Sequence, residues 1–153
     1  MVPFSLVGLH PICQLVLDIE PFASQSVRVT KSGRCYPDSA KMAFMAEVAR
    51  QVSEQWQAPP LDIPIFLVLA WAFGAKRTAL RDTAPDVDNL HKPLLDGMAK
   101  ILYTVDSRIV GTCSLKMNVK GISKILVIPC VVRPHIQEIE KWFQDAKPRK
   151  SLK

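Results

Sequence analysis

The stretch "IPIFLVLAWAF", residues 63–73, is a continuous apolar run with the length and composition of a β-strand. A run without alternating polar residues is typical of a strand that is buried on both faces of a sheet. We therefore expect residues 63–73 to form the central strand of a sheet, with the rest of the chain arranged around it.

A helix is predicted directly before this strand, over "AKMAFMAEVARQVSEQW", residues 40–56. Either Asp38 or Ser39 can serve as its N-cap, because both side chains can accept a hydrogen bond from a free backbone N–H of the first turn. The prolines of "QAPPLD", residues 57–62, end the helix. Its predicted core face carries apolar residues at helical spacing: Met42, Met45, Val48, Val52 and Trp56.

A second helix is predicted after the strand, in "APDVDNLHKPLLDGMAKILYTVDSRIVG", residues 84–111. One helical face would carry Leu90, Leu94, Met98 and either Ile101 or Leu102. Pro93 lacks a backbone N–H, so we expect the helix to begin within the turn that precedes it.

The remaining segments complete a small layered fold. We expect a strand over residues 14–21, an irregular hairpin or ordered loop up to residue 38, an antiparallel pair over residues 108–119 and 123–132, and an amphipathic helix over residues 135–146. The order predicts an α/β (α+β) fold, with a mixed sheet of about four strands and two to three helices. Residues 1–146 would form a single domain, and residues 147–153 a basic C-terminal tail.

The composition favours a folded protein with a polyanionic partner. The chain of 153 residues is 48% hydrophobic and 22% charged, which is close to the average of globular proteins and far from a disordered or fibrous composition. Its net charge of +6 favours a polyanionic partner. The four cysteines form no C-x-x-C pair, so we expect reduced thiols. No apolar run approaches the roughly 20 residues that span a membrane, and the N-terminus lacks the basic start of a signal peptide. We expect the protein to be located in the cytoplasm, or wherever host or phage DNA resides.

The basic residues gather in two loops, which we take as candidates for binding nucleic acid. The last residues, "AKPRKSLK", are also basic, although a solvated tail explains them equally well. The candidate DNA-binding residues are Arg28, Lys31 and Arg34 in the first loop and Lys76, Arg77 and Arg81 in the second.

Acidic residues cluster around the second helix despite the positive net charge. In an extended segment, Asp86 and Asp88 would point to the same side, and Asp106 could approach them from the far end of the helix. Converging carboxylates favour a hard divalent cation such as Mg²⁺, which binds oxygen ligands. The alternative is structural: Asp88 could cap the helix, Asp86 could hold a turn after Pro85, and Asp106 could form an Asx turn.

The run "DVDNLHKPLLDGMAKILYTVDSRIV", residues 86–110, resembles the central motif of the RusA family of Holliday-junction resolvases. That motif is D-x-D-N-x-x-K, followed by a further acid about one helix later and an acidic turn into a strand. Six residues of this chain fall into the pattern: Asp86, Asp88, Asn89, Lys92, Asp96 and Asp106.

The resemblance implies a Mg²⁺-dependent endodeoxyribonuclease that cuts branched DNA, the four-way junction, as a homodimer. It implies that Asp86, Asp88 and Asp106 hold catalytic Mg²⁺ and that Lys92 contacts or orients the scissile phosphate. Asn89 and Asp96 match supporting positions. Relatives often carry two adjacent acids where this chain has Val105 and Asp106. The following "DSRIV" continues the pattern into the strand and aligns Asp106 with the second acid, whereas a register one residue different would place Ser107 there.

The sequence leaves three alternatives open. The chain could be a relative that binds DNA junctions without cutting them, a nuclease for other branched DNA, or a basic RNA-binding protein. His91 is expected to be structural and not a general base. Tyr103 could stack on or wedge open a junction, although a core or interface role is equally compatible with the sequence.

Overall fold

The computed structural model describes residues 8–24, 38–133 and 135–145. The predicted basic residues Arg28, Lys31 and Arg34 and the tail 147–153 lie outside these ranges. The elements in chain order are β1 (Leu9–Pro11), β2 (Leu15–Leu17), α1 (Ser39–Gln55), β3 (Ile65–Ala75), β4 (Ala79–Leu80), α2 (Val87–Met98), the short 3-10 helix η2 (Asp106–Arg108), β5 (Ile109–Lys120), β6 (Lys124–Val132) and α3 (Ile136–Asp145).

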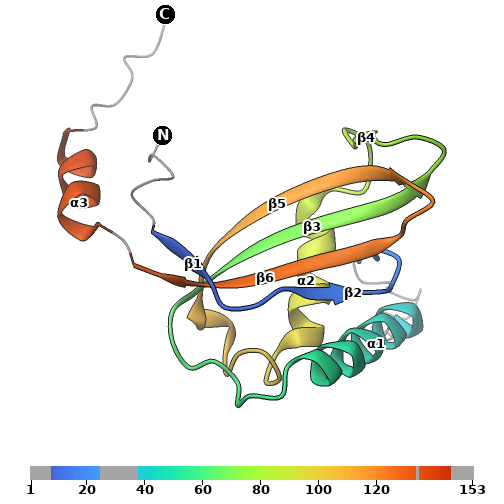
Figure 1. Cartoon of the computed structure of the whole chain (residues 1–153), viewed down its shortest axis with the longest axis horizontal. Coiled ribbons are helices and arrows are strands. Elements are labelled where there is room, and N and C mark those ends of the chain that lie inside the picture. Colours follow the sequence, from blue (N-terminus) through green and yellow to red (C-terminus); the bar gives the residue numbers. More distant parts are fainter. Residues whose placement is uncertain (1–7, 25–37, 134, 146–153) are drawn as a thin grey trace, which may run out of the picture.

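The described strands form one mixed six-stranded sheet in the order β1-β6-β3-β5-β4, with β2 also paired to β6 (Figure 1). Strand β3 lies in the middle, parallel to β5 and antiparallel to β6. The predicted α+β class, mixed sheet and central strand are confirmed. The predicted number of strands, about four, was too low. Strands β1 and β4 are only three and two residues long, which is too short to show the alternation of apolar and polar residues that identifies a strand.

The predicted antiparallel pairing of residues 108–119 with residues 123–132 is wrong. Strands β5 and β6 do run in opposite directions, but β3 lies between them. Their connection crosses the end of β3, where Gly121 N donates to Ala75 O at 3.2 Å and Gly74 N donates to Ser123 Oγ at 3.0 Å. Residues 121–123 therefore bridge two strand spacings, about 9.6 Å in total, instead of closing a tight hairpin.

Helices α1 and α2 pack on one face of the sheet and form the core with it (Figure 1). Along β3, Ile65, Leu67, Leu69 and Trp71 are buried on this face, whereas the alternate residues are only half-buried. The expectation that β3 is buried on both faces is therefore wrong. Within the described part of the chain, its second face stays partly open to solvent.

Helix α1 begins as predicted, because the Asp38 side chain accepts a hydrogen bond from Ala40 N at 3.0 Å. Its core face is rotated from the predicted one. Met42 is 55% exposed, and Phe44 is buried instead and stacks on Phe22 with ring centroids 5.4 Å apart. Val48 and Val52 are buried as predicted, while Met45 and Trp56 are half-buried.

Pro93 lies in the second turn of α2 and not in the first turn, where we expected it from the sequence. Pro93 has no N–H for Asn89 O, and Ser24 N donates to that carbonyl at 2.9 Å instead. Gly97 lets α2 approach α1 closely, because a Cβ at this position would lie 2.9 Å from Val48 Cγ1. The buried residues Leu90, Leu94 and Met98 follow the predicted face.

Helix α3 forms close to the predicted range and stands beyond the ends of β1 and β6 in Figure 1. Among residues 8–24, 38–133 and 135–145, no helix is long and apolar enough to cross a membrane.

The thiols of Cys13, Cys113 and Cys130 are free, as expected, and burial raises the pKa of Cys13 and Cys130. The thiols of Cys13 and Cys130 therefore stay protonated at neutral pH.

Candidate active site

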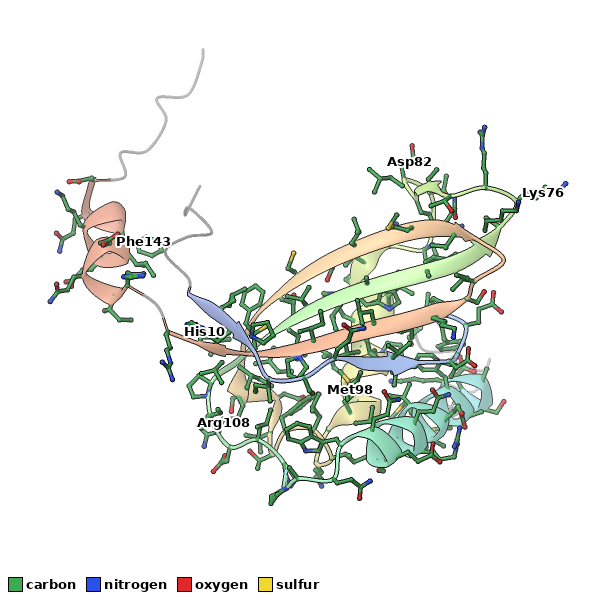
Figure 2. The ribbon with its side chains drawn as sticks, viewed as in Figure 1. His10, Lys76, Asp82, Met98, Arg108 and Phe143 are labelled. Atoms are coloured by element: carbon green, nitrogen blue, oxygen red, sulfur yellow. The ribbon has the colours of Figure 1, made fainter. Side chains whose placement is uncertain are left out.

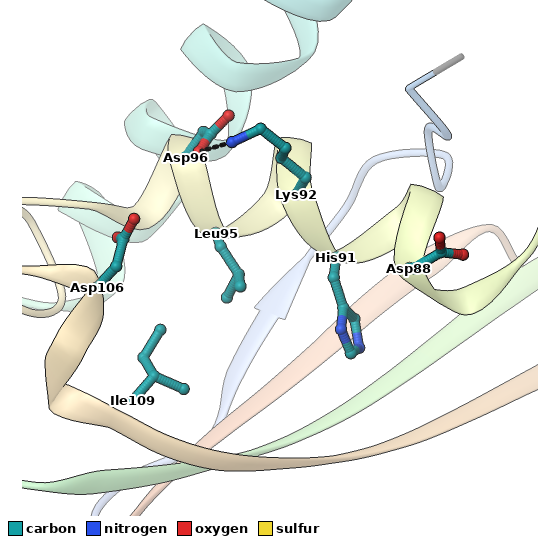
Figure 3. Close-up of a pocket in the computed structure, with 7 residues that line it drawn as sticks. All are labelled: Asp88, His91, Lys92, Leu95, Asp96, Asp106 and Ile109. Carbon is teal, nitrogen blue, oxygen red and sulfur yellow. Dashed lines mark hydrogen bonds and ion pairs between the residues drawn. The ribbon is translucent and has the colours of Figure 1, made fainter. Parts of the chain in front are cut away.

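A pocket of about 360 Å³ lies between α2 and the segment that leads into β5 (Figure 3). Four of the predicted site residues line it, although they come from positions up to 18 residues apart in the chain. The lining residues are Asp88, His91, Lys92, Leu95, Asp96, Asp106 and Ile109.

The first two acids stand at the beginning of α2. Asp86 is the N-cap residue with an extended backbone, and its side chain forms no capping hydrogen bond. Asp88 already lies in the first helical turn. The pair is therefore not part of one extended segment, as the sequence argument assumed, and Asp88 lines the pocket without Asp86.

Asp106 opens η2 and lines the same pocket, at the opposite end from Asp88 in Figure 3. Val105, which directly precedes the predicted third acid, is the N-cap of η2 and is 52% exposed. Within the described residues, the carboxylates of Asp86, Asp88 and Asp106 form no hydrogen bond or ion pair. A purely structural role would require each carboxylate to accept a hydrogen bond in a turn or a helix cap. The described residues show no such hydrogen bond.

Lys92 and Asp96 form an ion pair along α2, with Lys92 Nζ 3.4 Å from Asp96 Oδ1. The Lys92 side chain is 71% exposed, so its ammonium remains accessible to a ligand. The other carboxylate oxygen of Asp96 binds Lys41 Nζ at 3.1 Å, from α1. Sequence reasoning missed Lys41, because nothing in residues 39–55 indicates a partner on α2.

Comparison with known protein families identifies the chain. Residues 18–127, from the end of β2 to the middle of β6, match the family described as endodeoxyribonuclease RusA. The chain belongs to the RusA family. Members are phosphodiester hydrolases that resolve Holliday junctions, and the matched range contains the whole pocket. A comparison with curated proteins gave no match.

The donor chemistry of this RusA-family site fits the metal dependence of the family. Asp86, Asp88 and Asp106 offer oxygen ligands with no competing partner among the described residues, which is the ligand type that Mg²⁺ prefers. Across the described part of the chain, no three His, Cys, Asp or Glu side chains lie close enough together to hold a metal ion. Asp88 and Asp106 line one pocket without Asp86, and the three-acid ligand set stays a prediction.

His91 occupies the wall of the RusA pocket as a structural residue. Its ring stacks on Trp71 with centroids 5.2 Å apart, and its Nε2 lies 2.6 Å from Ser114 Oγ. Burial lowers the pKa of His91, and the nearby Asp88 carboxylate opposes this shift only in part. The ring is therefore neutral at pH 7 and fixed in place by two neighbours from the sheet.

Tyr103 lies in the core of the RusA fold and not at its surface. Its ring is fully buried, and its hydroxyl donates to Leu95 O at 2.6 Å. Burial raises the pKa of this hydroxyl. Of the roles that the sequence left open, which were stacking on DNA, an interface and the core, the core role agrees with this burial.

The described basic residues differ in what their side chains contact. Lys76 and Arg77 are exposed in the turn between β3 and β4, and Figure 2 shows Lys76 at the far tip of the sheet. The guanidinium of Arg81 is instead engaged within the chain: it binds Ala84 O and Asn118 Oδ1. The DNA-binding role of Arg81 stays a prediction, and these contacts favour a structural role.

Proposed function

We propose that the pocket on α2 is the catalytic site with which this RusA-family chain hydrolyses phosphodiester bonds of a four-way DNA junction. One observation carries the proposal: within a protein of net charge +6, Asp88 and Asp106 line the same pocket as the exposed ammonium of Lys92, and neither carboxylate has a described partner. Unpaired carboxylates lower stability through mutual repulsion, so their presence favours a functional explanation.

In this proposal Asp86, Asp88 and Asp106 hold Mg²⁺, and Lys92 binds a nonbridging oxygen of the scissile phosphate. Bound Mg²⁺ supplies a water of lowered pKa and counter-charge for the phosphate. Lys92 adds a fixed positive charge where negative charge develops in the transition state. Asp96 positions the Lys92 ammonium through the 3.4 Å ion pair, and Asn89 takes the supporting position that the resemblance implies.

The proposal also assigns the DNA contacts and the assembly. Lys76 and Arg77 would bind phosphates of a junction arm, together with Arg28, Lys31 and Arg34 from outside the described residues. The active form would be a homodimer, since a twofold protein can present two sites to the two symmetry-related strands of a junction. The protein would act wherever the DNA of its host or phage resides.

The test is cleavage of a labelled four-way junction beside a matched linear duplex, with and without Mg²⁺. Wild-type protein should nick the junction symmetrically and only with Mg²⁺, and Asp88→Asn should lose this activity by a factor on the order of 100 or more. Asp82→Asn is the matched control, because this exposed acid lies in the loop before α2 and not in the pocket.

Other outcomes would replace the proposal. Junction binding without any cut would indicate a noncutting DNA-binding relative, and preferential cutting of flaps or forks would indicate a nuclease for other branched DNA. Preference for RNA without a need for Mg²⁺ would indicate an RNA-binding protein. Light scattering during size-exclusion chromatography tests the homodimer, which a single-chain mass would contradict.

A further inference from the structure

Two cationic side chains hold three consecutive peptide carbonyls directly before α2. Lys116 Nζ donates to Thr83 O at 2.9 Å and to Pro85 O at 2.7 Å. The carbonyl between them, Ala84 O, accepts from Arg81 Nε at 2.9 Å and from Arg81 Nη2 at 2.6 Å. Hydrogen bonds from charged donors are shorter and stronger than neutral ones, so these four bonds fix the backbone of residues 83–85.

Both cations are themselves anchored to the sheet. Lys116 lies on β5 in register with the buried Trp71 of β3. Arg81 donates through Nη1 to Asn118 Oδ1 at 2.9 Å, and its Cζ lies 4.4 Å from the centroid of the Phe73 ring. The loop before α2 is thereby tied to the two strands in the middle of the fold.

The position of the two acids that follow depends on this loop. Asp86 and Asp88 are exposed, and their carboxylates have no hydrogen bond or ion pair within the described part of the chain. No side-chain contact therefore sets where these carboxylates point. Their placement follows from the backbone that enters α2. Lys116 and Arg81 hold this backbone through the carbonyls of residues 83–85.

We propose that Lys116 and Arg81 are positioning residues that place Asp86 and Asp88 for binding a divalent cation. This inference rests on the proposed function, in which those two acids hold Mg²⁺. Lys116 acts as a point charge shared by two carbonyls, and Arg81 acts through its rigid fork on the carbonyl between them. Arg81 thus contributes to the site by fixing the chain and not by binding DNA.

The experiment measures the binding of Mn²⁺, as a spectroscopic substitute for Mg²⁺, to the full-length protein by electron paramagnetic resonance. Lys116→Met keeps most of the aliphatic side chain and removes the ammonium. Loss of a residue that orients metal ligands typically weakens metal binding 10- to 100-fold, so we expect the dissociation constant to rise by about 10-fold. Arg81→Met should weaken binding in the same direction.

The matched control is Lys120→Met on the same strand, because the described residues give the Lys120 side chain no hydrogen bond or ion pair. It should bind Mn²⁺ as wild type does. In the cleavage assay, Lys116→Met should shift the Mg²⁺ midpoint to higher concentration by the same factor and leave kcat at saturating Mg²⁺ unchanged. Without metal, amide hydrogens of residues 82–88 should exchange faster in Lys116→Met than in Lys120→Met.

The outcomes separate the two proposals. If wild type binds Mn²⁺ and both Lys116→Met and Arg81→Met bind it equally tightly, the positioning role is wrong and the proposed function stands. If wild type neither binds Mn²⁺ nor cuts the junction, the proposed function fails, and this inference fails with it. Should Lys116→Met not fold, Arg81→Met decides the outcome alone by the same measurements.

Discussion

Lys92 and Asp96 form an ion pair on adjacent turns of α2, with the ammonium nitrogen 3.4 Å from Asp96 Oδ1. Lys41 binds the other oxygen of the same carboxylate at 3.1 Å. One carboxylate is therefore shared by two lysines, one that lines the pocket and one that does not. This arrangement holds the Lys92 ammonium close to the pocket while most of its side chain stays exposed.

Replacement of Asp96 should impair catalysis more than metal binding. Asp96→Asn removes the charge that restrains Lys92, and a misplaced catalytic group costs up to about 100-fold in rate, so we expect single-turnover cleavage to slow by about 10- to 100-fold. The Mg²⁺ midpoint should remain unchanged, because Asp96 is not a predicted ligand. Lys41→Met leaves the Lys92 pair intact and should cut at nearly the wild-type rate. Equal losses in both variants would contradict this assignment.

The turn between β3 and β4 should contribute affinity without contributing to the chemical step. Changing both Lys76 and Arg77 to Gln should reduce the slope of log affinity against log salt by about 1.8, since each lost phosphate contact contributes about 0.9. The cleavage rate at saturating junction should not change. Arg50→Gln is the control for loss of a positive charge elsewhere on the surface, because Arg50 is already paired with Glu47 and Glu54. An unchanged slope in the double variant would exclude this turn from the DNA-binding surface.

The contribution of His91 to stability should decrease as the pH falls. Burial holds the pKa of His91 below its ordinary value of about 6.5, so below pH 6.5 the unfolded chain takes up the proton before the folded one does. The difference in unfolding free energy between wild type and His91→Gln should therefore shrink between about pH 7.5 and pH 5. Urea unfolding at several pH values measures it. A difference that grows towards acid would show that the folded protein binds the proton more tightly.

The rotated face of α1 predicts a contrast between two neighbouring apolar residues. Phe44→Ala removes a buried ring that stacks on Phe22, so it should lower the unfolding free energy by about 3 to 5 kcal/mol. Met42→Ala changes a side chain that is 55% exposed and should change stability by less than about 0.5 kcal/mol. Thermal or urea unfolding of both variants checks this. Comparable losses would indicate that a further segment or subunit covers Met42.

The longer elements of this fold could be predicted from the sequence, because the periodicity that identifies them is local. The apolar run at residues 63–73 predicted β3, which spans Ile65–Ala75, and the helical spacing before it predicted α1 to within one residue. The pairing of β5 and β6 could not be predicted in this way. The residues around Gly121 resemble those of a tight turn, and only the insertion of β3 separates the two strands.

In the candidate site, too, the residues of a local motif could be predicted, whereas the contacts between distant segments could not. The resemblance to the RusA motif predicted that the acids Asp86, Asp88, Asp96 and Asp106 lie together with Lys92, and all of these except Asp86 line one pocket. The contacts that shape this pocket come from residues distant in the chain: Lys41 reaches Asp96 across 55 positions and Ser114 reaches His91 across 23. No local pattern marks such residues, since a lone lysine or serine is equally compatible with a solvated surface.

The insertion of β3 between two later strands also bears on how the chain folds as it is synthesised. A nascent chain that ends before residue 109 contains the apolar run of β3 but neither of the strands that flank it. All main-chain pairing of β3 with β5 and β6 is non-local, and such topologies fold slowly because distant segments must meet before any of their contacts form. The run at Ile65–Ala75 therefore emerges from the ribosome as exposed hydrophobic sequence, and it becomes protected only after translation has passed β6.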